Sequence, residues 1–139
     1  MFDTLAYKLS VLYKNFYAYA SARLHPFGLH NAWIFFILYV GKHADCTPAE
    51  LTKSLHVDWG YSQRCITKLV EEGFLTKEKA GRSYHLNLTG KGQQVYQESH
   101  QLFFDWDRLR LSALTEEERH TLFQLLQKMS CQEEDIHHV

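Results

Sequence analysis

The chain has 139 residues, of which 45% are hydrophobic and 14% aromatic, and its formal net charge is −1. This composition excludes a disordered polar chain and predicts one compact domain with a substantial core. No apolar run approaches the roughly 20 residues of a membrane span, and residues 1–10 lack the pattern of an export signal, so we expect a cytoplasmic protein without membrane contact.

The three cysteines are an odd number without paired spacing, which indicates reduced thiols: Cys46, Cys65 and Cys131. Cys65 is expected to turn inward beside Ile66, where apolar surroundings blunt thiol reactivity. Cys46, next to Thr47, is expected to be more exposed and therefore the better candidate for oxidation.

Residues 3–24 are predicted to form a long helix capped by Asp3 or Thr4. Its apolar residues recur at helical spacing and widen beyond a single stripe. So broad an apolar surface needs cover on more than one side, so we expect a partner chain against it. After a break at His25-Pro26-Phe27-Gly28, residues 31–42 are predicted to form a second helix. It is apolar nearly all round and is expected to be buried on all sides.

Two short helices are predicted next. Thr47 and Glu50 form a capping box at the start of the first, and Asp58 caps the second, which ends near Gly73. The second helix buries one stripe and is expected to expose a row of hydrogen-bond donors, namely Ser62, Gln63, Arg64, Thr67 and Lys68. Two helices joined by a tight turn in this way indicate a helix-turn-helix.

A two-stranded hairpin is predicted to follow, with its turn at residues 79–82. The alternation of Tyr84, Leu86 and Leu88 with polar residues is expected to place these three side chains on the helices. The hairpin tip carries Lys79, Arg82 and Ser83, and a basic tip suits a wing that enters a DNA minor groove. The sequence therefore predicts a mainly α, winged helix-turn-helix fold that binds double-stranded DNA.

Residues 92–112 and 115–132 are predicted to form two final helices, the last opened by a capping box of Thr115 and Glu118. Charge is unevenly distributed: residues 50–92 carry seven basic and five acidic groups, and residues 105–139 carry four and eight. A modest positive region suits a dimer, in which each copy adds its own phosphate contacts.

Enzyme activity is not expected, because we find no metal-binding pair beside a catalytic acid, no phosphate-cradling glycine loop and no nucleophile beside a base. No cofactor is expected. A winged helix that binds protein instead of DNA is the alternative from another functional class.

Three stretches carry a resemblance to a known family: Gly28-Leu29 before the aromatic-rich helix, residues 69–75 (LVEEGFL) and residues 88–92 (LTGKG). Together with the order of elements over essentially the whole chain, they resemble the multiple-antibiotic-resistance regulator (MarR) family of bacterial transcription factors. The resemblance implies an obligate homodimer that binds a pseudo-palindromic operator, usually as a repressor. It also implies release by a small molecule, a metal or an oxidant.

On this resemblance, residues 29–92 form the DNA-binding part, and residues 1–28 and 93–139 form the dimerisation helices. Dimer contacts are expected from Leu5, Leu9, Leu12, Leu122, Leu125 and Leu126. Arg64 is expected to contact a guanine edge, Gln63 an adenine or a phosphate, and Thr47 a phosphate at its helix N-terminus. Arg82 matches the family's wing arginine, but Ala80-Gly81-Arg82 lacks the usual acidic residue, and the wing is short. Trp59 is also unusual for the family: it either stacks near the DNA backbone or fills a gap, and we expect it to fill a gap.

A small aromatic or apolar effector is the favoured trigger, in a cleft lined by Tyr13, Phe16, Tyr17, His30, Trp33 and Phe36. Zinc sensing is an alternative raised by the nine histidines, including His137-His138. The histidines are scattered without cysteine or carboxylate clusters at ligand spacing, so no metal site is expected.

Overall fold

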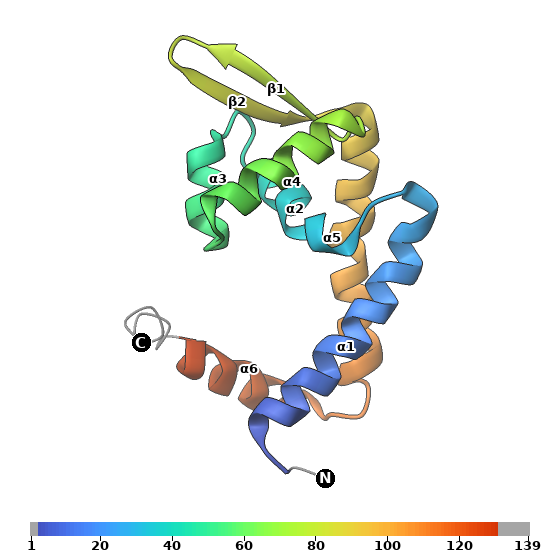
Figure 1. Cartoon of the computed structure of the whole chain (residues 1–139). Coiled ribbons are helices and arrows are strands. Elements are labelled where there is room, and N and C mark those ends of the chain that lie inside the picture. The colour runs from blue at the N-terminus through green and yellow to red at the C-terminus, as the bar shows by residue number, and fades with distance from the viewer. Residues whose placement is uncertain (1–2, 131–139) are drawn as a thin grey trace. The chain divides into compact units, whose positions relative to one another are not determined.

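The computed structural model describes residues 3–130, which form mainly helices with one two-stranded antiparallel hairpin (Figure 1). The chain divides into two compact units, Met1–Phe104 and Asp105–Val139. Cys131, His137 and His138 lie outside the described residues, as does the predicted end of the last helix. Within the described range, no helix has the length and apolar character that a bilayer crossing requires.

The first unit begins with α1 (Leu5–Leu24), where the hydroxyl of the N-cap Thr4 accepts a hydrogen bond from the N–H of Tyr7. A short 3-10 turn follows α1, and Gly28 ends it with a φ of 73°, a left-handed conformation that glycine adopts without strain. A second 3-10 turn then leads into α2 (Ile34–Lys42). The predicted break and second helix are therefore confirmed.

The helix-turn-helix consists of α3 (Pro48–Leu55) and α4 (Trp59–Glu71). Both hydrogen bonds of the predicted capping box are present, because Glu50 N–H donates to the Thr47 hydroxyl and Thr47 N–H donates to the Glu50 carboxylate, each at 3.1 Å. Asp58 caps α4 by accepting from the N–H of Tyr61. Local chemistry thus sets the start of each helix.

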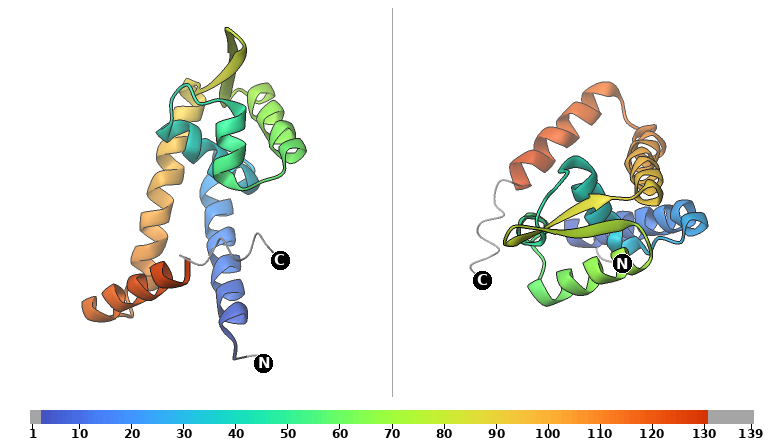
Figure 2. Two further views of the ribbon diagram at one scale, coloured as in Figure 1. Left: turned by 90° about the vertical axis from the view of Figure 1, so that its left-hand side faces the viewer. Right: turned by 90° about the horizontal axis from the view of Figure 1, so that it is seen from above.

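The wing consists of β1 (Leu75–Ala80) and β2 (Ser83–Leu88), paired from Leu75 with Leu88 to Ala80 with Ser83. Gly81 is the first of the two residues between the strands and has a φ of 66°, which suits a tight hairpin turn with glycine at that position. The hairpin projects beyond α3 and α4 (Figures 1 and 2). Its tip is therefore exposed.

The base of the wing is joined to the segment before α3. Leu86 N–H donates to the carbonyl of Cys46 at 2.8 Å. The side chain of Asn87 makes two hydrogen bonds with Asp45: its Oδ1 accepts from the backbone N–H, and its Nδ2 donates to the carboxylate. These contacts fix the position of the wing relative to the helix-turn-helix.

The core of the first unit lies where α2, α3, α4, the wing and α5 (Gly90–Leu111) meet, and Phe36, Ile37, Leu69, Phe74 and Leu102 are fully or almost fully buried there. The prediction that α2 is buried on all sides is wrong. Phe35 on α2 is 49% exposed, and Leu38 and Tyr39 are only partly buried. One apolar side of α2 therefore remains open.

The second unit contains the end of α5 and α6 (Glu116–Ser130). The predicted second capping box is present, with Thr115 and Glu118 exchanging hydrogen bonds of 2.9 and 3.1 Å. No described residue of α6 is buried, and Phe123 and Leu125 are more than half exposed. The apolar side of α6 therefore has no cover within this unit.

Candidate nucleic-acid interface

The outer side of α4 carries most of the predicted reading residues. Arg64, Thr67 and Lys68 are exposed, and Gln63 is partly exposed. These four side chains line a shallow hollow of about 300 Å³ on the helix surface. Lys68 lies 3.5 Å from the carboxylate of Glu71, but an ion pair this exposed is weak and leaves the ammonium available to another anion.

Ser62 is a correction to the predicted row of donors. Its side chain is fully buried, and its hydroxyl lies 2.6 Å from the hydroxyl of Thr52, which also donates to the carbonyl of Pro48. Ser62 therefore joins α4 to α3 instead of facing outward. Hydroxyls can satisfy each other between packed helices, and the spacing along one helix does not reveal this.

Thr47 is partly exposed at the N-terminus of α3. Both its hydroxyl and its N–H take part in the capping box with Glu50, so a carboxylate already lies at this helix end. The carboxylate competes with a phosphate for the positive end of the helix. A contact between Thr47 and a DNA phosphate stays a prediction, and the phosphate would have to compete with the Glu50 carboxylate.

The wing tip exposes Lys79, Arg82 and Ser83, as a wing that enters a groove requires. The prediction that Tyr84 packs onto the helices is wrong, because its side chain is 44% exposed. The tip of the hairpin extends past the body of the helices, so the inward alternation buries Leu86 but leaves Tyr84 open. The ammonium of Lys77 lies 4.8 Å from the Tyr84 ring centroid.

Trp59 belongs to this surface, although we expected it to fill a gap. It is the first residue of α4 and is 54% exposed, so the prediction is wrong. It lines a hollow of about 340 Å³ between α3, α4 and the wing, together with Thr47, Pro48, Ala49, Gln63, Lys77, Ser83 and Tyr84. The spacing of Trp59, one helical turn before Gln63, is the sequence signal for a shared face.

The six residues predicted to line an effector cleft differ from one another in burial and in the residues that they contact. Phe36 is buried in the core, whereas Tyr13 and Tyr17 are exposed on α1 with ring centroids 6.2 Å apart. His30 pairs with Trp33, and Phe16 packs on Phe103, with ring centroids 5.6 and 4.8 Å apart.

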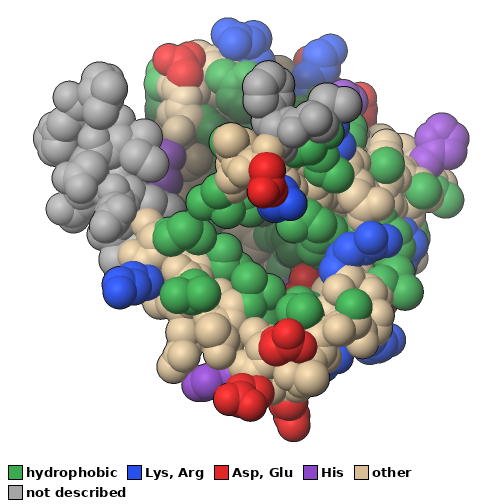
Figure 3. Space-filling model, turned by 90° about the horizontal axis from the view of Figure 1, so that it is seen from below, with side chains coloured by type: hydrophobic (Ala, Val, Ile, Leu, Met, Phe, Trp, Pro, Cys, Tyr) green, Lys and Arg blue, Asp and Glu red, His purple; other side chains and the backbone are tan. Residues whose placement is uncertain are grey.

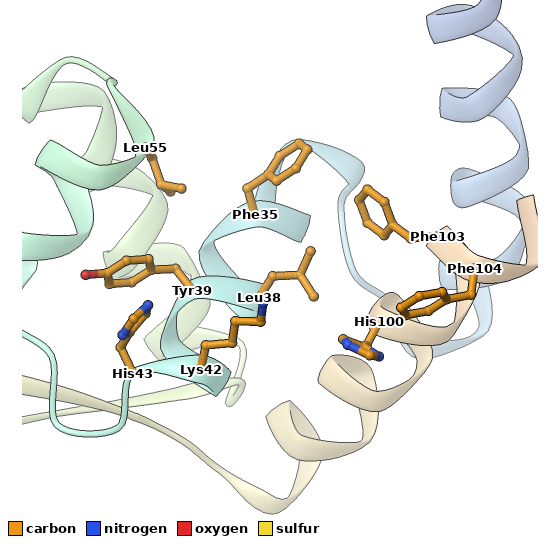
Figure 4. A pocket seen from close by; sticks show the side chains of 9 residues that line it. All are labelled: Phe35, Leu38, Tyr39, Lys42, His43, Leu55, His100, Phe103 and Phe104. Atoms are coloured by element: carbon orange, nitrogen blue, oxygen red, sulfur yellow. The ribbon is translucent and has the colours of Figure 1, made fainter. Parts of the chain in front are cut away.

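A different hollow, of about 320 Å³, lies against the open side of α2 (Figure 4). Side chains of α2 and α5 line it, and His43 after α2 and Leu55 at the end of α3 complete the lining. Its walls are largely apolar and aromatic, and the lining residues whose side chains carry nitrogen are Lys42, His43 and His100. None of the six predicted cleft residues lines this hollow.

The prediction that Cys46 is the more exposed thiol is wrong. Cys46 is 3% exposed and Cys65 is 5% exposed, so Cys65 turns inward as expected. Burial, followed by the nearby Glu50 carboxylate, raises the pKa of the Cys46 thiol to about 11. A thiol with this pKa is almost entirely protonated at neutral pH and reacts slowly with oxidants. Among residues 3–130, no group of three or more histidine, cysteine or acidic side chains is arranged to hold a metal ion.

No protein-family model matches the sequence. A curated relative, the HTH-type transcriptional regulator BilQ of Clostridium symbiosum (strain WAL-14163), is 36% identical over 132 residues, which are 93% of this chain and 92% of that protein. The solved structure of a MarR protein from Peptoclostridium difficile matches with a TM-score of 0.86 and 22% identity over 97% of this chain and 91% of that one. A mutant MarR from E. coli, solved in complex with operator DNA, matches with a TM-score of 0.76 and 28% identity over 90% of this chain and 92% of that one.

Proposed function

The chain belongs to the MarR family of transcriptional regulators, and from that membership we propose that it is a homodimeric DNA-binding repressor. It recognises a pseudo-palindromic operator and is released from it by a small aromatic or apolar effector. The E. coli relative bound to operator DNA supports the choice of partner.

The proposal of DNA binding rests on two elements with exposed cationic side chains, α4 and the wing. Arg64 and Lys68 project from α4, and Lys79 and Arg82 project from the wing. The hollow lined jointly by α3, α4, β1 and β2 places the wing beside the start of α4. A helix in a major groove with a basic tip in the adjoining minor groove fits this arrangement. The curated relative is a transcriptional regulator, so it gives no support to an enzyme activity.

Exposed apolar side chains support the homodimer. On α1, Leu5, Leu9 and Leu12 are 55%, 44% and 44% exposed, and on α6 Leu125 is 54% exposed. Hydrophobic side chains are also plentiful on the surface seen from below (Figure 3). Monomeric proteins seldom leave this much apolar surface in water, and a second copy of the chain supplies cover. In the dimer, two copies of α4 meet half-sites roughly 34 Å apart, one turn of DNA.

The test compares two cations on the same helix. Arg64→Ala should cost about 1–3 kcal/mol of operator affinity and relax base preference at one position, because its guanidinium pairs with a base edge. Lys68→Ala should weaken all duplexes similarly and lower the salt slope by about one, because its ammonium meets a phosphate. Fluorescence anisotropy over a salt series measures both.

Two results would contradict the proposal. Binding that does not weaken as salt rises would favour a protein-interaction module. Unchanged base preference in Arg64→Ala would mean that another side of α4 faces the DNA.

We place the effector site in the hollow between α2 and α5, and not in a cleft lined by the six residues predicted from the sequence. Its aromatic walls suit a planar ligand, and Lys42, His43 and His100 supply hydrogen-bond donors or a positive charge for a phenolate or carboxylate. A ligand there would favour a different spacing of the two copies of α4, one that no longer matches successive major grooves. A screen of planar aromatic acids and phenols by thermal melting tests this site, and a melting temperature that no compound raises would count against it.

A further inference from the structure

An exposed aromatic pair stands on the surface assigned to DNA. Trp59 and Tyr84 are 54% and 44% exposed, although an indole and a phenol ring bury well in a core. They line one hollow, Trp59 from the first turn of α4 and Tyr84 from β2, with Pro48 and Ala49 adding apolar surface. The hollow therefore has apolar and aromatic surface from these four residues, in a region whose other exposed side chains are mainly polar or cationic.

Gln63 connects this hollow to the reading surface of α4. It lines both the hollow with Trp59 and the hollow with Arg64, Thr67 and Lys68. It also lies one helical turn after Trp59, so the two side chains share a face. A ligand edge that reaches Gln63 therefore also reaches the indole.

The amide nitrogen of the Gln63 side chain has no hydrogen-bond acceptor among the described residues. This nitrogen, Nε2, is also buried. A buried N–H without an acceptor is unfavourable, so Gln63 gives up no hydrogen bond of that group when it turns toward a base. Adenine offers the matching pair, an N7 acceptor and an N6 donor.

We infer that Trp59 is a specificity-determining residue that contacts the 5-methyl group of a thymine, next to an adenine that Gln63 reads. This inference rests on the proposed DNA binding. In unmodified DNA, the thymine methyl is the apolar group that the base pairs present in the major groove. It suits the apolar surface of this hollow, which lies at the start of the reading helix. The ammonium of Lys77 at the same hollow complements the negative charge of the neighbouring phosphate.

The experiment removes only the methyl group. The purified full-length chain selects duplexes from a random-sequence library, and the best-bound duplex is remade with deoxyuridine in place of thymidine at one position at a time. Burial of one methyl group predicts that the dissociation constant rises about fourfold at the contacted thymine. Positions that Trp59 does not reach should show no change and serve as internal controls.

Variants of Trp59 connect that effect to the indole. Trp59→Ala should bind the thymidine duplex at least about fourfold more weakly and should no longer distinguish it from the deoxyuridine duplex. Trp59→Phe keeps an apolar ring and should retain part of the discrimination. An unchanged melting temperature in both variants shows that the fold is intact, which half-exposure of the side chain leads us to expect.

Two outcomes separate this inference from the proposed function. A wild-type chain that binds a duplex but tolerates every deoxyuridine, or a methyl effect that persists in Trp59→Ala, would overturn the role of Trp59 and leave DNA binding intact. A wild-type chain that selects no duplex even at low salt would overturn DNA binding and this inference with it.

Discussion

At the residue scale, Cys46 illustrates how burial lowers the reactivity of a thiol. Its carbonyl accepts the hydrogen bond from Leu86 that joins the wing to the segment before α3, and its side chain is buried. The thiol therefore lies in the core of the first unit. Its burial is the main cause of its raised pKa.

We predict slow alkylation of Cys46 in the folded chain. At about pH 8 a thiol whose pKa is about 11 is far less ionised than an ordinary cysteine, and the core also shields it. Iodoacetamide labelling followed by peptide mass spectrometry should therefore find Cys46 protected in the native chain and modified in urea. Equal labelling in both conditions would restore it as a candidate oxidation sensor.

The same pKa shift predicts how stability depends on pH. The thiol titrates near 9.0 when unfolded and near 11 when folded, so its contribution to stability is complete below pH 9 and is lost between pH 9 and pH 11. The free energy of unfolding should fall less over this window in Cys46→Ala than in the wild type. Tyrosines and lysines titrate in both chains, so the difference between the chains isolates the thiol.

At the element scale, the start of α5 holds the wing and α4 together. The hydroxyl of Thr89 donates to the carbonyl of Gly73 at 2.5 Å and accepts from the N–H of Gly92 at 3.0 Å. Gly92 is buried, and a β-carbon on it would collide with the carbonyl oxygen of Phe74. This backbone contact requires glycine at position 92.

We predict that Gly92→Ala destabilises the fold by about 1–3 kcal/mol or more, because the colliding atom belongs to the backbone and cannot rotate away. Gly90→Ala is the matched control, because a β-carbon at Gly90 meets no atom within 4 Å and alanine favours a helix. Urea unfolding of both variants measures the contrast. Similar midpoints would show that the close approach at Gly92 contributes little.

At the scale of the whole molecule, each of the two units contains a helix whose described residues are mostly exposed. Buried residues of α1 are confined to Ala20 and Leu24 near its end, and α6 has none among those described. Such helices depend on packing against another surface, because most of the stability of a helix in a protein comes from packing its apolar face. The stability of the chain is therefore expected to depend on its concentration.

Leu125→Lys should shift the chain from a dimer toward its monomer mass of 16.4 kDa, because the lysine places a charge in the proposed apolar contact. Gln124→Lys adds the same charge at a neighbouring polar, exposed residue of α6 and should leave the dimer in place. Sedimentation equilibrium distinguishes these outcomes. A wild-type chain that sediments as a monomer at micromolar concentration would contradict the proposed homodimer.

The sequence by itself determined the order of the elements and where most of them begin. The capping boxes at Thr47 and Thr115, the cap at Asp58 and the turn at Gly81 each depend on residues at most a few positions apart. Interactions this local can be read from the spacing of residue types. The exposed row of Arg64, Thr67 and Lys68 follows in the same way from helical periodicity.

Only the tertiary structure decided which side chains on a predicted face remain open. Ser62 is buried because Thr52 of another helix meets its hydroxyl, and Phe35 is open because α2 is left uncovered on that side. Trp59 and Tyr84 are exposed around one hollow although they are far apart in the sequence. Periodicity specifies the direction of a side chain from its own helix or strand, whereas burial depends on what another segment places opposite it.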